Sequence, residues 1–217
     1  SVGPGAVLHD LIACGRVPVT ELTHIYRQGA GSRIVLNAHA VNRGTMPELA
    51  RPDGASDADF FWIDQDDPEH AVNIIAEMVC QRIPDRFGHD PVRDIQVLTP
   101  MNRGGCGANL LNERLQERIN PPDSRKESVR FGERELRVGD RVMQIVNNYD
   151  KDVFNGDLGE IARVDASAKQ FDVRYEQGVV GYEWNEADQV RVAYAVTVHK
   201  SQGSEFPVVV MPVLTQH

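Results

Sequence analysis

The sequence predicts an α/β protein in which a helix-covered parallel sheet carries an inserted small antiparallel β-barrel. Helical and strand-like apolar patterns alternate as far as residue 122. Between residues 140 and 190 the pattern changes to short strands separated by Gly, Asn and Asp turns, which is typical of a small barrel. After residue 190 the chain returns to apolar blocks, which favours an insertion over two domains in tandem.

The first part of the chain predicts two short helices and two strands. Apolar residues at helical spacing predict a helix over residues 6–14, and residues 17–19 predict a short buried strand. Ser32 can cap a second helix that reaches Asn42. Residues 60–63 predict a further strand. The inward face of the second helix would consist of Ile34, Val35, Ala38 and Val41.

The middle of the chain predicts the buried elements of the parallel sheet. A long helix is expected over residues 67–83 and should end at Pro84, because proline lacks an amide hydrogen. Residues 94–98 form a continuous β-branched run, which is typical of a buried parallel strand, and Thr99 follows it. Residues 108–119 predict another helix. Its apolar face consists of Leu110, Leu111, Leu115 and Ile119.

A break at residues 120–124 leads into the predicted barrel. Its expected strands are residues 141–146, 159–164, 171–175 and 179–184. Turns separate them where Gly and Asn occur, because these residues tolerate a positive φ. Residues 208–214 would complete the parallel sheet or, alternatively, add a strand to the barrel.

The composition excludes several classes of protein. The chain has 217 residues, a net charge of −9 and 41% hydrophobic residues, which argues against a disordered chain. No apolar run is long enough to span a bilayer and no secretory signal is visible, so we expect a cytoplasmic protein with no membrane partner. The three Cys are widely spaced, which argues against a zinc site or a disulfide framework. Because the chain is acidic, nucleic-acid binding would need a local cleft.

The segment from residue 195 to 206 is the most informative for function. An apolar strand runs into a loop that carries hydroxyl, imidazole, ammonium and amide groups. Loops at the carboxyl ends of parallel strands are where α/β sheets bind ligands, so Thr197 and Ser201 could hold phosphate oxygens. His199 with Ser201 could also indicate a nucleophilic hydrolase, although no nucleophile elbow or orienting acid is apparent. Composition alone fits an ordinary polar loop.

Four stretches resemble the RecD/TraA family of superfamily 1 helicases. AYAVTVHKSQGSEFP at residues 193–207 is similar to motif V of that family, and LTHIYRQ at residues 22–28 resembles its motif IV. DIQVLTPM at residues 94–101 also looks like the family, as do GDRVMQ, NNYDK and FNGD between residues 139 and 157. The matches follow the order of the family and cover nearly the whole chain.

The resemblance implies a domain organisation. Residues 1–122 and 190–217 would form the second RecA-like motor domain, of the P-loop NTPase type, of a 5′→3′ DNA helicase, and residues 123–189 an SH3-like barrel. The chain departs from the family in lacking the Walker A and Walker B sequences and motif VI. We therefore expect a C-terminal fragment that is inactive alone, whose parent uses ATP and Mg²⁺.

The resemblance also implies partners. These are single-stranded DNA, the missing N-terminal RecA-like domain of the same chain and, in some relatives, subunits of a nuclease complex. A role in plasmid transfer stays open, because the family includes conjugative relaxase-helicases. The alternative is a non-enzymatic module on a helicase-like scaffold that binds nucleic acid or protein.

Roles at the ATP cleft follow from the same motifs. Arg27 would reach the γ-phosphate as an arginine finger, and Gln28 would orient a phosphate or Arg27 itself. Their alternatives are a surface ion pair and a solvated amide. Glu205 would accept a hydrogen bond from the ATP ribose, with Gly203 allowing the nucleotide to approach. We expect residues 26–28 and the loop from Thr197 to Glu205 to lie side by side at the rim of one sheet.

Two loops would contact single-stranded DNA. The residues expected there are Thr197, His199, Lys200 and Ser201 in the motif V-like loop and Thr99, Asn102 and Arg103 after the central strand. A structural histidine and ordinary turn chemistry are the alternatives. In the barrel, Tyr149 could stack on a base, but packing against the motor domain is favoured.

Overall fold

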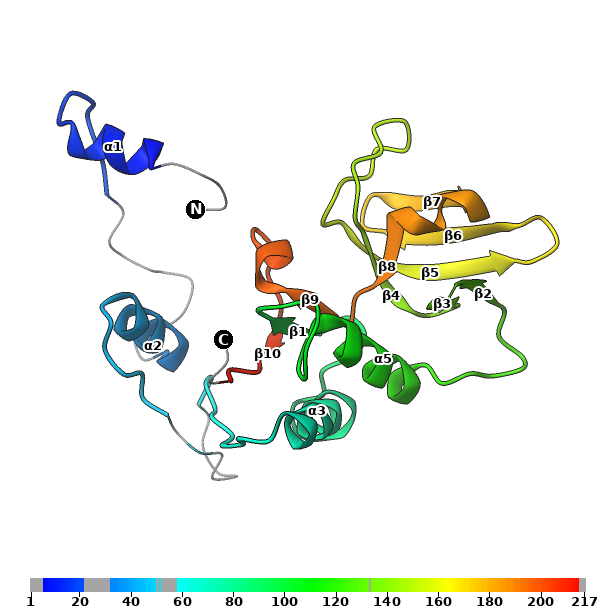
Figure 1. The fold of residues 1–217 in the computed structure, drawn as a ribbon, viewed down its shortest axis with the longest axis horizontal. Coiled ribbons are helices and arrows are strands. Elements are labelled where there is room, and N and C mark those ends of the chain that lie inside the picture. The colour runs from blue at the N-terminus through cyan, green and yellow to red at the C-terminus, as the bar shows by residue number, and fades with distance from the viewer. Residues whose placement is uncertain (1–5, 22–31, 50, 52–57, 133, 215–217) are drawn as a thin grey trace. The chain divides into compact units, whose positions relative to one another are not determined.

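The computed structural model describes residues 6–21, 32–49, 51, 58–132 and 134–214 (Figure 1). The chain divides into two compact units, Ser1–Asp64 and Gln65–His217. None of the helices in these described ranges is long and apolar enough to cross a membrane.

The first unit contains two helices at the predicted places, α1 Val7–Ala13 and α2 Arg33–Asn42. Ser32 caps α2 as predicted, because its side chain accepts a hydrogen bond of 3.3 Å from the amide of Val35. The predicted inward face of α2 is wrong, since its buried residue is Asn37. The Asn37 side chain exchanges two hydrogen bonds with the backbone of Glu48, at 2.8 and 3.0 Å.

Two strands predicted in the first unit are not formed. Residues 17–19 and 60–63 are described and carry no strand, and Val17 and Val19 are exposed. A strand needs a neighbouring strand to pair with its backbone, and the described part of this unit supplies none. The apolar sequence alone therefore gave a wrong prediction at both places.

The second unit contains a three-stranded parallel sheet in the order β10-β1-β9. Its strands are β1 Ile95–Thr99, β9 Ala195–Thr197 and β10 Val208–Val210. The central position of β1 agrees with the buried strand predicted from its β-branched run. Since β10 pairs with β1, the alternative in which this segment adds a strand to the barrel is wrong.

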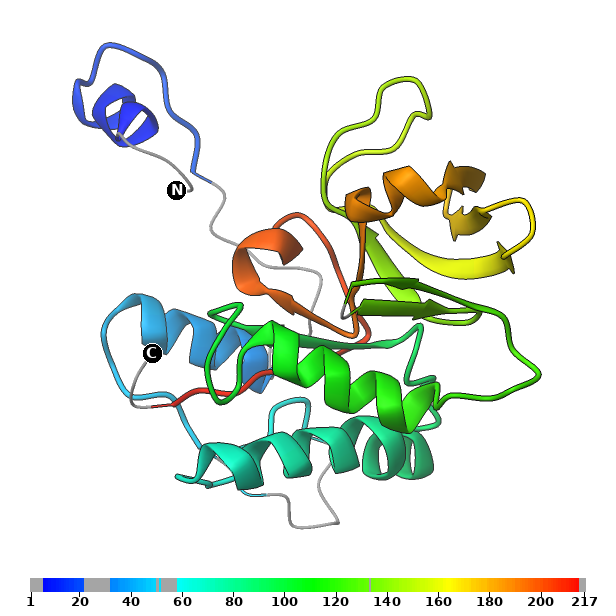
Figure 2. The ribbon, with the colours of Figure 1, turned by 45° about the vertical axis from the view of Figure 1, so that its right-hand side comes forward.

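Helices pack against this sheet, and Figure 2 shows α5 lying along the helical segment that starts with α3. These elements are α3 Pro68–Glu77, η1 Met78–Arg82, α4 Ile83–Phe87 and α5 Ala108–Ile119. The predicted helix end at Pro84 is wrong, because the π-helical turn η1 leads directly into α4 and the chain stays helical through Pro84 to Phe87. The core between helices and sheet includes Val72, Ile75, Val79, Ile95, Val97, Leu111 and Leu115.

An antiparallel sheet of five strands lies in the same unit, in the order β7-β6-β5-β4-β8. Its strands are β4 Arg141–Gln144, β5 Leu158–Asp165, β6 Gln170–Tyr175, β7 Gly178–Glu183 and β8 Val190–Val192. The first four were predicted, whereas the hairpin of β2 Ser128–Phe131 and β3 Arg134–Arg137 was not. Trp184, predicted in a strand, begins the 3₁₀ turn η2 Trp184–Gln189. Closure into a barrel and the domain boundaries stay predictions.

Asp140 and Arg141 join the two sheets. The buried carboxylate of Asp140 accepts hydrogen bonds from four donors: the amide of Arg137 and the side chains of Gln116, Asn120 and Tyr194, at 2.6 to 3.0 Å. The guanidinium of Arg141 donates to the carbonyls of Val92 and Ile95. Burial lowers the pKa of Arg141 to about 10.

Candidate nucleic-acid interface

The strand register brings two loops to one edge of the parallel sheet. Thr99 at the end of β1 lies opposite Thr197 at the end of β9. The loop of residues 101–107 follows β1, and the 3₁₀ turn η3 Val198–Ser201 follows β9 (Figure 2). Since these strands are parallel, both loops leave the carboxyl edge of the sheet, where α/β proteins bind ligands.

The first loop folds tightly onto the start of α5. The Thr99 hydroxyl donates to the carbonyl of Cys106 at 2.7 Å and is fully buried. A Cβ added at Gly107 would lie 2.6 Å from the carbonyl carbon of Arg103, so only glycine fits there. Thr99 therefore shapes the loop and cannot itself touch DNA as predicted, whereas Asn102 and Arg103 are exposed.

The η3 turn presents His199 and Lys200 at the same edge. His199 is exposed, whereas Thr197 at the end of β9 is buried, so the predicted contact of the Thr197 side chain with DNA is not supported. The Ser201 hydroxyl donates to the carbonyl of Val198 at 2.9 Å, within its own turn. Because this hydroxyl points to a carbonyl and not to an imidazole, the geometry does not support a hydrolase that uses Ser201 with His199.

Lys200 connects this edge to the antiparallel sheet region. Its Nζ atom donates to Oδ1 of Asn155 at 3.3 Å. Partial burial lowers the pKa of Lys200, and the positive charge of Arg191 lowers it further. Within the described ranges, no ion pair joins either cation to a carboxylate.

The strand that leads into η3 is fixed from α5. The side-chain amide of Asn112 donates to the carbonyl of Ala195 and accepts from its amide, both at 2.8 Å. Gln96 donates to the carbonyl of Tyr194 at 3.0 Å. Sequence reasoning missed Asn112, although a polar residue at helical spacing from Leu115 and Ile119, on the apolar face of α5, was an available signal.

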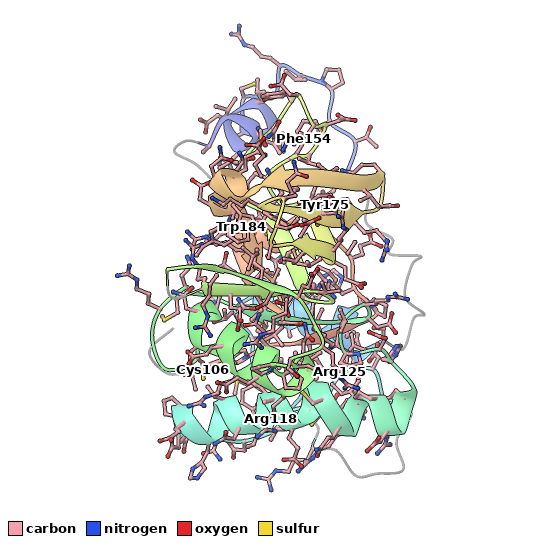
Figure 3. The ribbon with its side chains drawn as sticks, turned by 90° about the vertical axis from the view of Figure 1, so that its right-hand side faces the viewer. Cys106, Arg118, Arg125, Phe154, Tyr175 and Trp184 are labelled. Atoms are coloured by element: carbon pink, nitrogen blue, oxygen red, sulfur yellow. The ribbon has the colours of Figure 1, made fainter. Side chains whose placement is uncertain are left out.

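Tyr149 does not pack as favoured from the sequence. Its side chain is 77% exposed, and its ring lies edge-on to Phe154 with the centroids 5.9 Å apart. Figure 3 shows Phe154 in the loop above the strand that carries Tyr175 and the turn that begins at Trp184. The interpretation of Tyr149 as a packing residue is therefore wrong.

The structure describes only two of the four residues predicted at the ATP cleft, Gly203 and Glu205. Arg27 and Gln28 lie outside the described residues. Gly203 has a φ of +86°, which explains a glycine there by backbone conformation alone, and Glu205 is exposed. Over the described parts of the chain, no group of three or more His, Cys, Asp or Glu side chains could hold a metal ion.

Comparison with known proteins identifies two segments. Residues 111–175 match the family described as the ATP-dependent RecD-like DNA helicase SH3 domain. Residues 192–217 match the UvrD-like helicase C-terminal domain. The first match spans β2 to β6 together with most of α5, and the second includes β9, η3 and β10.

Two curated relatives agree with these families. The ATP-dependent RecD2 DNA helicase of Deinococcus radiodurans is 32% identical over 207 residues, which cover 92% of this chain and 26% of that protein. The RecBCD enzyme subunit RecD of Buchnera aphidicola is 32% identical over 116 residues, which cover 52% of this chain and 19% of the relative. The chain thus spans about a quarter of the length of the first relative.

Solved structures support the fold. The Pif1 helicase from Bacteroides in complex with ADP-AlF3 and single-stranded DNA has a TM-score of 0.54 at 17% identity, covering 90% of this chain and 46% of that one. Bacteroides Pif1 bound to single-stranded DNA gives 0.50 at 16% identity, covering 88% and 45%. The resemblance to RecD-like superfamily 1 helicases, read from the four motifs, is confirmed by the family and curated matches.

Proposed function

We propose that this chain, a C-terminal region of the RecD-like superfamily 1 helicases, contributes to a 5′→3′ DNA helicase. It would form one wall of the ATP cleft and part of the single-stranded DNA track. The parent would hydrolyse ATP between two RecA-like domains, of which this chain supplies the second. Closure of the cleft would then move this domain along the strand.

The observation that carries the proposal is the pairing of Thr99 with Thr197. It places the exposed side chains of Arg103 and His199 on loops that leave the same edge of the sheet. A guanidinium and an imidazole on adjacent loops can both donate hydrogen bonds to the phosphates of one strand. Two such loops can follow a DNA backbone more readily than one.

The nucleotide belongs mainly to the other half of the motor. The phosphate cradle and its lysine are absent from this sequence, so ATP and Mg²⁺ would be held by the N-terminal RecA-like domain. Arg27, Gln28, Gly203 and Glu205 are proposed to complete the cleft from this side. Subunits of a nuclease complex are proposed partners, since one relative is a RecBCD subunit. The three free thiols are consistent with a cytoplasmic parent protein.

Binding of single-stranded DNA by this chain tests the proposal. The probe is a fluorescein-labelled oligothymidylate of about 12 nucleotides, followed by anisotropy at low salt. We expect saturable, salt-sensitive binding that His199→Ala weakens and His70→Ala, an exposed histidine on α3, leaves unchanged. We also expect no ATP turnover by the chain alone.

Two results would overturn the proposal. ATP turnover above that of a protein-free sample would mean that the chain is not one wall of a shared cleft. No saturable binding of the oligothymidylate, or equal binding by the His199→Ala and His70→Ala variants, would remove η3 from the DNA track.

A further inference from the structure

An exposed aromatic pair lies next to the basic edge formed by η3. The side chains of Tyr149 and Phe154 are 77% and 39% exposed, and their ring centroids lie 5.9 Å apart. Aromatic side chains carry large apolar surfaces that folding usually buries. Two exposed rings in contact leave flat apolar surface on which a nucleobase could stack.

Hydrogen bonds hold the loop that carries this pair. Oδ1 of Asn147 accepts from the amide of Asn155 at 2.9 Å, and its Nδ2 donates to the Tyr149 hydroxyl at 3.4 Å. The backbones of Asn148 and Val153 exchange two hydrogen bonds, at 2.8 and 3.1 Å, which close the loop. The aromatic pair is therefore presented in a defined geometry before any ligand arrives, which lowers the entropy cost of binding.

The same loop contacts a pair of cations. Asn155 follows Phe154 directly, and its Oδ1 accepts from Nζ of Lys200 at 3.3 Å. Arg191 on β8 is exposed, and β8 lies beside this loop. Val190 pairs with Gln144, whose carbonyl accepts a hydrogen bond of 2.9 Å from the amide of Gly156, the residue after Asn155. Within the described residues, neither cation forms an ion pair with a carboxylate. Two cations without a carboxylate partner attract an anion, and the phosphate of a nucleotide is such an anion.

The negative charges of the loop decide which part of a nucleotide faces which group. Asp150 and Asp152 are exposed beside the aromatic pair and would repel a phosphate there. Lys151 does not offset them, because its ammonium pairs with Glu186 at 2.6 Å. We therefore expect the neutral base to stack on the aromatic rings and the phosphate to lie near Lys200.

We infer that Tyr149 and Phe154 form a base-stacking platform for single-stranded DNA and that Arg191 joins Lys200 in binding the adjacent phosphate. This inference rests on the proposed function, because it extends the DNA track from η3 onto the SH3-like region. It assigns Tyr149, Phe154 and Arg191 to the DNA track. Stacking together with phosphate contacts is how single strands are held without sequence preference.

The two halves of the site have different signatures in oligothymidylate binding. Tyr149→Ala should weaken binding by about fivefold or more without changing its salt dependence, and Tyr149→Trp should restore it. Arg191→Ala should weaken binding and reduce the slope of log affinity against log salt by about 0.7. The matched controls are Phe87→Ala, another exposed aromatic, and Arg134→Ala on β3, which should both bind as the unaltered chain does.

An oligonucleotide with abasic sites separates stacking from charge. On this probe Tyr149→Ala should bind as the unaltered chain does, while Arg191→Ala should still bind more weakly. All the altered side chains are exposed, so equal urea midpoints are expected and will verify folding.

Two outcomes would contradict the inference. Tyr149→Ala could bind oligothymidylate as tightly as Phe87→Ala does, or Arg191→Ala could keep the salt slope of Arg134→Ala. If His199→Ala still weakens binding in that case, only this inference fails. If the unaltered chain binds no oligothymidylate, the proposed function fails as well.

Discussion

The hydroxyl of Tyr194 donates a hydrogen bond of 3.0 Å to the carboxylate of Asp140, across 54 positions of the sequence. Tyr194 lies just before β9, which leads into η3, and Asp140 lies just before β4 of the antiparallel sheet. The contact therefore joins the candidate DNA edge to the SH3-like region. The proposed track crosses this junction, so its geometry depends on the junction remaining intact.

Replacement of Asp140 should destabilise the fold strongly. Asp140→Ala would remove the acceptor shared by three buried donors and the half-buried Gln116 side chain, and we expect a loss of at least about 3 kcal/mol in the free energy of unfolding. Asp140→Asn should also destabilise, because one oxygen becomes an amide nitrogen that faces donors. Urea unfolding measures the change, with the exposed Asp150→Ala as control. Similar midpoints for the two alanine variants would contradict the network.

Asn112 should be more important for stability than its neighbours on the same helix. Asn112→Ala would leave the amide and carbonyl of Ala195 without their side-chain partner, at a cost of about 1–3 kcal/mol. Asn109→Ala, at an exposed position of α5, should change the free energy of unfolding by less than about 0.5 kcal/mol. Chemical denaturation of both variants tests this difference, and equal losses would argue against it.

Gly159 should not accept a methyl group. A Cβ there would lie 2.7 Å from Cγ1 of Val173 and 2.8 Å from the carbonyl oxygen of Arg174, so β5 and β6 would have to separate. We expect Gly159→Ala to destabilise by about 1–3 kcal/mol. Gly181→Ala is the milder comparison, because its nearest neighbour is the Asp172 side chain at 3.3 Å. Thermal unfolding should rank the two variants in this order, and the reverse order would show that the close contact is relieved.

The three thiols should react at different rates. Cys14 is exposed, whereas burial raises the pKa of both Cys80 and Cys106. Because the thiolate is the reactive form, a raised pKa and burial both slow alkylation. At mildly alkaline pH we expect one fast thiol per folded chain, which Cys14→Ser removes, and two more after unfolding. Labelling of all three at one rate would contradict the partial burial of Cys80 and the burial of Cys106.

Sequence patterns correctly predicted the elements that have a continuous apolar pattern of their own. The helix over residues 108–119 and the strand that ends at Thr99 occur where expected, because their apolar periodicity is continuous. The β2–β3 hairpin escaped prediction, since charged residues dominate it. The strands expected at residues 17–19 and 60–63 failed because strand formation depends on a partner, which an apolar run does not specify.

The candidate site was only partly predictable. The motifs identified both loops at the sheet edge, but they did not show where each hydroxyl points. Thr99 and Ser201 bond to carbonyls of their own loops, which depends on the loop backbone. The contacts of Asn112 and Asp140 join residues 83 and 54 positions apart, and no local pattern encodes such pairs.

Photocrosslinking shows directly which segments of the chain contact single-stranded DNA. An oligothymidylate that contains iododeoxyuridine is bound to the chain, irradiated, and the attached peptides are identified by mass spectrometry. We expect crosslinks within residues 101–107 and 198–205, the two loops at the carboxyl edge of β1 and β9. Crosslinks confined to the β2–β3 hairpin or to α3 would contradict it.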